Sequence, residues 1–255
     1  MKNTNINKHL SVLGLFCRST LWRLLAVSLL AIAAEVLMFL PKLKSSAFHG
    51  IEACIQYSNI RWVLCVWYLL FLIILSLPGT DLGSKSIYTY RRLQISEKWV
   101  FVWQCIYNLL AFALLWMLQV VTAYGLCRLY TAMAPAEFVT QQSIFLAFYR
   151  SDLLHSILPL EETTRWAVNI FILISSAVSS AYFPFKNRRG SFAVSLVLEA
   201  LIVVICFVRP LGNFGLLPLV LPFVAAVDLF MVFAWEEDDD DVQREVKQAS
   251  DGAVI

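Results

Sequence analysis

The chain has 255 residues, of which 60% are hydrophobic and only 15% are charged, and its formal net charge is +2. A soluble domain carries about 25% charged residues to solvate its surface, so this composition excludes an ordinary water-soluble protein. The small net charge does not favour a nucleic-acid partner either. The composition instead predicts an all-α polytopic membrane protein, because an apolar helix satisfies its own backbone hydrogen bonds in lipid.

Six apolar runs have the length of a membrane crossing, which needs about 20 mostly apolar residues. Polar segments separate the runs, and aromatic residues stand at most of their ends, as is typical of side chains at the lipid headgroups. In chain order the predicted spans are 24–40, 62–77, 99–124, 166–185, 192–208 and 216–235. The sequence therefore predicts one six-helix transmembrane domain over residues 24–235.

The distribution of basic residues predicts that both termini are cytoplasmic. With the amino terminus inside, most of the 20 Lys and Arg residues fall in cytoplasmic segments, as the positive-inside rule requires. The acidic run 236–241 does not oppose this orientation, because carboxylates contribute little to the rule. We expect residues 236–255 to form a disordered, solubilising tail. The basic residues on the cytoplasmic side are Lys2, Lys8, Arg18, Arg23, Lys85, Arg91, Arg92, Lys98, Lys186, Arg188, Arg189, Arg244 and Lys247.

The segment before the first span is amphipathic. Apolar residues recur every three or four positions, and polar residues occupy the opposite side. One interpretation is an interfacial helix, residues 1–23, that lies flat on the inner leaflet. The other is a positively charged leader that only sets the orientation. The apolar positions are Ile6, Leu10, Leu13, Cys17 and Leu21.

The longest predicted outer segment covers residues 128–165. Its middle is apolar, but Pro135 and Pro159 interrupt it, and no run within it reaches the length of a crossing. We expect a surface helix or a re-entrant hairpin there rather than a seventh span.

The cytoplasmic loop 79–98 carries the most specific local pattern in the chain. Pro78 and Gly79 end the second span. The apolar residues that follow recur at three-residue spacing, which predicts a short helix between the membrane surface and the cytosol. Ser96 is expected to cap the third span, with Glu97 in its first turn. The apolar positions of the short helix are Ile87, Tyr90 and Leu93.

This loop resembles the coupling element of ABC exporter membrane subunits of the type-2 permease family. In that family a Gly-containing turn precedes a cytoplasmic helix that ends in a leucine-x-hydrophobic-serine phrase and docks onto an ATPase. The matching residues are Gly83, Leu93, Ile95 and Ser96, and Gln94 stands where the family often has Pro. The layout of six spans with both ends inside is similar as well. The resemblance implies that the ATPase contact is formed by Ser84, Lys85, Tyr88, Arg91, Arg92, Leu93, Ser96 and Glu97.

The resemblance implies a transport subunit that is not itself an enzyme. A separate ABC ATPase would bind ATP and Mg²⁺, since this chain has no G-x-x-x-x-G-K-[ST] loop to hold nucleotide phosphates. We expect no metal and no cofactor on this chain. The second partner would be another copy of the permease or a paralogue, in the plasma membrane of a bacterial cell.

Several polar residues fall inside the predicted spans, where an ionised group costs about 3 kcal/mol. They are expected to line a substrate path or to hydrogen-bond inside the membrane, and Glu199 and Asp228 are the first candidates. For the amides, contact between helices is an equally open interpretation. The complete set is Glu35, Gln104, Asn108, Gln119, Asn169, Glu199 and Asp228. Small residues four apart on the fourth span predict close helix packing; they are Ser175, Ser176, Ser179 and Ser180.

The leading hypothesis is thus a permease that moves an apolar or amphipathic molecule, such as a lipid-like compound, an antimicrobial peptide or a drug. A non-transporting scaffold or immunity protein is a second class that the residues leave open. A third is an intramembrane enzyme, because Glu161, Glu162 and Arg165 are similar to the glutamate-glutamate-arginine motif of CAAX proteases. That family has one more residue before the arginine, and its later histidine ligands have no counterpart here.

Overall fold

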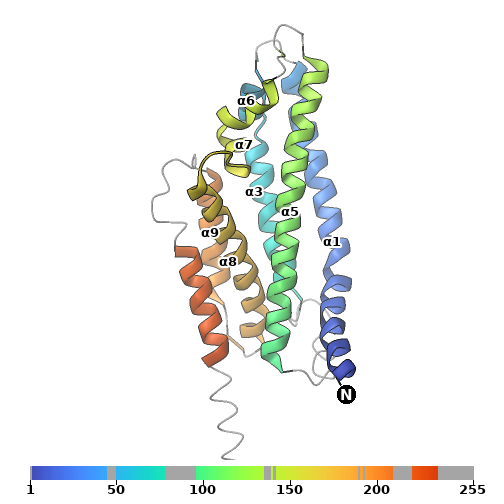
Figure 1. Cartoon of the computed structure of the whole chain (residues 1–255), viewed down its shortest axis with the longest axis vertical. Helices are drawn as coiled ribbons and strands as arrows, with labels where there is room; N and C mark the ends of the chain where they lie inside the picture. The colour runs from blue at the N-terminus through green and yellow to red at the C-terminus, as the bar shows by residue number, and fades with distance from the viewer. Residues whose placement is uncertain are drawn as a thin grey trace, which may run out of the picture.

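The computed structural model describes residues 2–44, 50–78, 96–134, 139, 142–188, 190–191, 193–208 and 220–234. Within these ranges all regular elements are helices, in agreement with the predicted all-α class. The long helices form one bundle, and two short helices, α6 and α7, lie at one end of it (Figure 1). The helices are α1 (Lys2–Lys44), α2 (Ile51–Tyr57), α3 (Ile60–Ser76), α5 (Glu97–Met133), α6 (Ser143–Arg150), α7 (Asp152–Ile157), α8 (Thr163–Asn187), α9 (Val194–Val208) and a last helix, Val220–Ala234.

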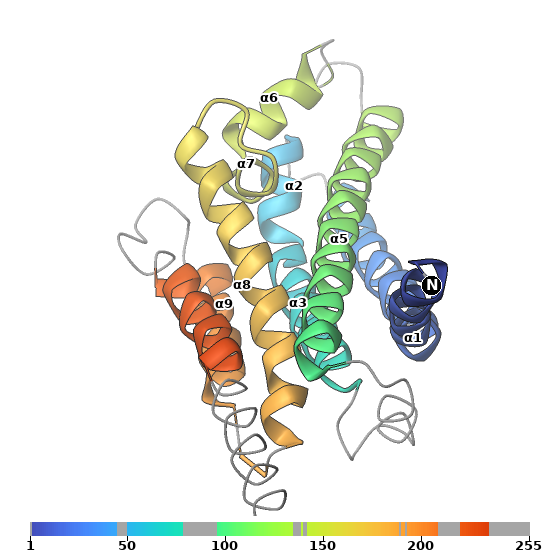
Figure 2. The same ribbon diagram turned by 60° about the horizontal axis from the view of Figure 1, so that its bottom comes forward.

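Successive long helices run in opposite directions. The chain starts at the lower end of Figure 1, where α3 also ends and α5 begins, whereas α6 and α7 lie at the upper end. We call these the amino-terminal end and the capped end. Helix α8 packs against α3, α5 and α9, and α1 packs against α3 and α5. Figure 2 shows the result, with α1 on one side of the bundle, α9 on the other and α8 between them.

Helix α1 runs without a break through residue 23, where the sequence analysis ended an interfacial segment and began a span. Its buried positions recur every three or four residues along nearly its whole length, and they form one seam against α3 and α5. Because the seam includes Val12 and Phe16, these early turns of α1 are held by packing against the bundle. The buried positions are Val12, Phe16, Thr20, Leu24, Ser28, Ala31, Glu35 and Phe39.

The early turns of α1 pack against α5. Phe16 stacks on Tyr107 of α5 with ring centroids 6.1 Å apart, and the Thr20 and Tyr107 hydroxyls are 2.6 Å apart. The predicted stripe included Leu21, which is 46% exposed. The residues of 2–23 therefore begin α1 rather than forming a separate helix, and their contact with the inner leaflet stays a prediction.

Three helices are long and apolar enough to cross a membrane within the described residues: Ser11–Leu43, Glu97–Met133 and Thr163–Asn187. A fourth crossing results if α2 and α3 are counted together, although they bend by 56° at a break where Asn59 has φ 57°. The described parts of α9 and of the last helix, Val220–Ala234, are apolar and lie within the predicted spans 192–208 and 216–235. Six complete crossings therefore stay a proposal.

The outside of the bundle is apolar, as lipid contact requires. Large hydrophobic side chains are exposed on every long helix, whereas a soluble monomer rarely exposes a contiguous apolar surface of this extent. The chain is thus a membrane-embedded protein. Examples of these exposed side chains are Leu29 and Leu30 on α1, Leu110 and Leu114 on α5, Leu201 on α9, and Phe223 and Phe230 on the last helix.

The described part of segment 128–165 contains the end of α5, helices α6 and α7, and the start of α8. Helix α5 continues to Met133, nine residues past the predicted end of its span, and α6 and α7 then fold over the end of the bundle (Figure 1). Neither α6, with 8 residues, nor α7, with 6, is long enough to cross a bilayer. The described part of this segment is therefore a cap on the helix bundle.

Candidate functional site

Helix α8 carries a stripe of four fully buried serines through the centre of the bundle, Ser175, Ser176, Ser179 and Ser180. The small side chains allow close packing, as the sequence analysis expected, but they also hydrogen-bond to four neighbouring helices. Each hydroxyl has one hydrogen to donate and can accept as well, so a serine can link two partners. The stripe is therefore a polar axis inside an apolar bundle.

Glu199 of α9 lies at one side of this stripe with its side chain fully buried. Ser176 Oγ donates to Glu199 Oε1 at 2.6 Å, and Ser175 Oγ contacts the same oxygen at 3.1 Å. The Tyr68 hydroxyl of α3 is 2.6 Å from Ser176 Oγ. Because Ser176 gives its hydrogen to Glu199, Tyr68 must donate to Ser176. A continuous chain of hydrogen bonds thus links α3, α8 and α9.

Two further helices contact the same stripe. Ser179 Oγ donates to Asp228 Oδ2 of the last helix at 3.4 Å, and Asn108 Nδ2 of α5 donates to Ser180 Oγ at 2.8 Å. The two carboxylates that the sequence analysis ranked first, Glu199 and Asp228, therefore meet the same face of α8. They are close enough to interact electrostatically, although no hydrogen bond joins them.

A second polar pair joins α1 to α5. Gln119 Nε2 donates to Glu35 Oε2 over a long 3.4 Å contact. Glu35 is fully buried and Gln119 is 4% exposed. Among the described residues, Glu35 Oε1, Gln119 Oε1 and Glu199 Oε2 are buried without a hydrogen-bond partner. Such atoms are expensive in an apolar interior, and they are frequent where a ligand completes the set of contacts.

Gln104 lies apart from these clusters. Its Nε2 donates to the carbonyl oxygen of Pro78 at 3.5 Å, near the amino-terminal end where α3 stops and α5 begins. Although Gln104 and Asn108 share one face of α5, they form hydrogen bonds with different partners. Gln104 therefore secures a helix end, whereas Asn108 belongs to the serine stripe.

A cavity of about 130 Å³ lies between α3, α5, α7, α8 and α9. Most of its wall is apolar, and two of its polar wall residues lead to buried carboxylates. Tyr68 connects to Glu199 through Ser176, and Gln119 contacts Glu35 directly. A mostly apolar pocket with a few convergent polar groups is the usual form of a small-molecule site. The lining residues are Arg61, Leu64, Tyr68, Leu115, Trp116, Gln119, Asp152, Leu153, Ser156, Ile157, Asn169, Ile172, Leu173 and Cys206.

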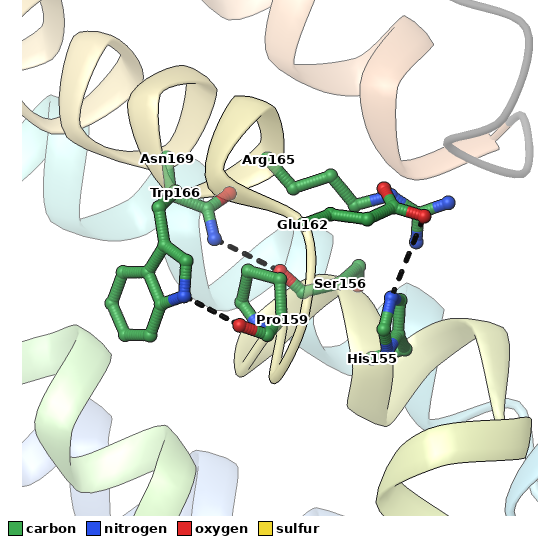
Figure 3. A network of polar contacts seen from close by, with 7 residues as sticks. All are labelled: His155, Ser156, Pro159, Glu162, Arg165, Trp166 and Asn169. Atoms are coloured by element: carbon green, nitrogen blue, oxygen red, sulfur yellow. Dashed lines mark hydrogen bonds and ion pairs between the residues drawn. The ribbon is translucent and has the colours of Figure 1, made fainter.

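The cap covers this cavity and is fastened to the bundle by side chains of α5 and α8. Trp116 Nε1 of α5 donates to the Ile157 carbonyl at 3.0 Å, and Asn169 Nδ2 of α8 donates to the Ser156 carbonyl at 2.9 Å. Trp166 of α8 donates to the Pro159 carbonyl, as Figure 3 shows. These bonds fix the carboxyl end of α7 over the cavity.

The glutamate-arginine motif lies in the same cap, on the outside. Glu162 forms an ion pair with Arg165, and His155 Nε2 is 3.9 Å from Glu162 Oε1 (Figure 3). Glu161 and Glu162 are exposed. In the described part of the chain no group of three His, Cys, Asp or Glu side chains could hold a metal ion. Within the structure, Glu162 and Arg165 of the motif form the ion pair that closes the turn before α8.

Most of the predicted ATPase-contact residues lie outside the described residues: Ser84, Lys85, Tyr88, Arg91, Arg92 and Leu93. Ser96 is the N-cap residue of α5 with an extended backbone, but its side chain makes no capping hydrogen bond, and Glu97 occupies the first turn. The acidic tail from residue 236 onward is outside the described ranges as well.

Comparison of the chain with known protein families, with curated proteins and with solved structures finds no match. The similarity to ABC permeases thus depends on the residues of loop 79–98 and on the layout of the spans.

Sequence reasoning missed Tyr68 as a polar partner and treated the serines only as packing residues. The sequence did contain a signal for these bonds, because four hydroxyls on one face of an apolar helix can donate hydrogen bonds to carboxylates on neighbouring helices. Which neighbours these would be depends on contacts between residues 23 to 108 positions apart.

Proposed function

We propose that the chain is the membrane-spanning permease subunit of an ATP-driven exporter, and that its capped cavity holds an apolar or amphipathic substrate during transport. The observation that carries this proposal is the cavity itself, an apolar chamber inside a lipid-exposed bundle whose wall connects to two buried carboxylates. Ionisable groups inside a membrane protein typically mark a substrate or ion path.

The two ends of the bundle support a transport cycle. The cavity lies toward the capped end, whereas α3 ends and α5 begins at the amino-terminal end. Alternating access needs a substrate site and a distant element whose movement changes which end of the bundle is open. In this proposal a cytoplasmic ATPase binds loop 79–98. When the ATPase dimer closes on ATP, α3 and α5 rotate relative to α8 around the cavity.

The proposed partner proteins follow from the resemblance of loop 79–98 to the coupling element of ABC permeases. ATP and Mg²⁺ bind a separate ABC ATPase, and a second permease copy or a paralogue completes the membrane part. Both termini and loop 79–98 are cytoplasmic, in a bacterial cell membrane. The α2–α3 pair, α9 and the helix Val220–Ala234 supply the crossings beyond the three longest helices.

Reconstitution tests the proposal. The purified chain and its ATPase are placed in proteoliposomes, and substrate-dependent ATP hydrolysis and ATP-dependent transport are measured. Replacing Arg91 and Arg92 by Ala should uncouple hydrolysis from transport, because these residues supply charge to the ATPase contact. The matched control replaces Lys42 and Arg128, two basic residues at the capped end, and should leave coupling intact.

Two results would refute the proposal: a chain that never associates with an ATPase, or identical coupling in the Arg91/Arg92 and the control variants. A chain that folds and binds a partner protein without ATP-dependent transport would instead support the scaffold or immunity class.

A further inference from the structure

A second hollow near the capped end has an entirely apolar lining. It is a groove of about 360 Å³ between α5, α6 and the turn before α8, and all eight lining residues are aliphatic or aromatic. Pockets that hold ligands begin at about 300 Å³. We call this hollow the α5–α6 groove. Its lining includes Val120, Val121 and Tyr124 of α5, Phe145 and Phe148 of α6, and Leu160.

The α5–α6 groove continues the lipid-facing surface of α5. Four large side chains, spaced three or four residues apart, form one stripe along this helix, and each of them is between 59% and 62% exposed. The last of them, Val121, also lines the groove. Since lipid covers the exposed apolar side chains of a membrane-embedded helix, an acyl chain that lies along this stripe reaches the groove directly. The stripe consists of Leu110, Leu114, Met117 and Val121.

A basic side chain follows the groove on the same face of α5. Arg128 is four residues beyond Tyr124, which places it one helical turn, about 6 Å, closer to the capped end. Its Nε donates to the Tyr124 hydroxyl at 2.9 Å, and its guanidinium carbon is 5.5 Å from the centre of the Tyr124 ring. Tyr124 therefore joins the apolar wall of the groove to a cation.

Most donors of Arg128 are available to a ligand. The side chain is exposed, and among the described residues no carboxylate forms an ion pair with it. A guanidinium has five N–H donors in a fork that matches a phosphate group, and the bond to Tyr124 uses one of them. Glu161, which follows Leu160 in the chain, lines a separate polar recess on the cap. The charge that the described residues place beside the groove is therefore positive.

From this arrangement we propose that the α5–α6 groove binds an anionic phospholipid. An acyl chain lies against Val121 in the groove, the phosphate accepts hydrogen bonds from Arg128, and Tyr124 positions the guanidinium between the two. The order along α5 of apolar stripe, tyrosine and arginine matches the order of hydrocarbon, interface and headgroups in a bilayer. The site goes beyond the proposed transport function. It lies at the end opposite to the proposed ATPase contact, so loss of Arg128 alters lipid binding and not the coupling to ATP hydrolysis.

Native mass spectrometry of the full chain tests the site. The purified, delipidated protein in a mild detergent is titrated with phosphatidylglycerol or with phosphatidylcholine of the same acyl chains, and the first bound lipid is quantified. Both lipids carry a phosphate, but only phosphatidylglycerol has a net negative charge. We expect phosphatidylglycerol to bind about fivefold more tightly, which is the effect of one basic residue at an anionic lipid surface.

Substitutions of the arginine test the headgroup contact. Arg128→Gln should abolish the fivefold preference, whereas Arg128→Lys, which keeps the charge, should retain most of it. The matched control is Arg150→Gln. Arg150 is also an exposed arginine at the capped end, but it lines the separate polar recess, so this variant should keep the preference.

A second pair of variants tests the acyl-chain contact. Val120→Trp fills the groove and should weaken the binding of both lipids about fivefold without changing their ratio. Leu114→Trp, on the same lipid-facing helix but outside the groove, should change neither. Size-exclusion profiles confirm that each variant is folded.

The inference is wrong if phosphatidylcholine binds as tightly as phosphatidylglycerol, if Arg128→Gln keeps the preference, or if Arg150→Gln removes it equally. Unchanged lipid binding in Val120→Trp would also contradict it. None of these measurements involves an ATPase. Lipid preference without ATP-dependent transport would refute only the proposed function, and transport without lipid preference would refute only this inference.

Discussion

Replacing Ser176 by Ala tests the hydrogen-bond chain at the centre of the bundle. Ser176 is fully buried, and its Oγ lies 2.6 Å from both the Tyr68 hydroxyl and Glu199 Oε1. The substitution removes both contacts and leaves a buried phenol without this acceptor. The matched control is Ser175→Ala, which changes the neighbouring buried serine but removes only a 3.1 Å contact to the same carboxylate and a 3.1 Å bond within α8, to the Ile172 carbonyl.

The expected magnitude follows from the number and kind of bonds. Hydrogen bonds between membrane helices average about 0.6 kcal/mol and reach about 1.7 kcal/mol. The two bonds of Ser176 are short and one of them involves a carboxylate, so both belong to the upper part of that range. We expect Ser176→Ala to lower the free energy of unfolding by about 2 kcal/mol, or about 30-fold in the folded-to-unfolded ratio. Ser175→Ala should lower it by about 0.5 kcal/mol.

Reversible unfolding in mixed micelles of increasing SDS content, followed by tryptophan fluorescence, measures both variants. A double-mutant cycle with Tyr68→Phe should return a coupling energy of about 1 kcal/mol, because both changes remove the same contact. Equal stabilities of the Ser176 and Ser175 variants, or a coupling energy near zero, would show that the hydroxyl chain does not hold the three helices together.

Three further predictions address α1, the orientation and the cap. Phe16→Ala should lower the free energy of unfolding by about 3 kcal/mol, because it removes a buried ring. The control Trp22→Ala, at a side chain that is 78% exposed, should have little effect. Equal effects of the two substitutions would contradict the packing of the early turns of α1. In intact cells whose native cysteines are replaced, an impermeant maleimide should label Glu161→Cys directly but Ser84→Cys only after permeabilisation, and the reverse pattern would overturn the proposed orientation. Trp116→Phe keeps an aromatic ring but removes the bond to the Ile157 carbonyl, so Leu153→Cys, on the buried inner side of the cap, should be modified about fivefold faster. An unchanged rate would mean that this bond does not hold the cap closed.

Each buried serine of α8 serves two roles that are usually treated as alternatives. The side chain is small enough for neighbouring helices to approach, and its hydroxyl can bond within α8 as well as across to a neighbour. Ser175 and Ser180 donate to the Ile172 and Ala177 carbonyls of their own helix at 3.1 Å. Local bonding of this kind keeps a hydroxyl satisfied before the helices associate, which reduces the net gain from each contact between them. The specificity of the assembly therefore depends on the partners that local bonding cannot replace, the carboxylates and Asn108.

Membrane embedding and the approximate positions of the long helices were determined by sequence alone, because an apolar run of sufficient length is a local property that lipid selects directly. The same reasoning identified the polar residues that must find partners, including Glu35, Gln119 and Glu199. The lengths of α9 and the last helix, and the ATPase contact, stay predictions.

Only the tertiary structure decided which partners those residues have and which face of α1 is buried. Both faces of the early turns of α1 carry apolar side chains, and the position of Tyr107 selects the one that contains Phe16. The link from Tyr68 through Ser176 to Glu199 joins helices that are distant in the sequence, and periodicity within one helix cannot specify the rotation of another. The cavity depends on the same rotations, because it is the space that five packed elements leave between them.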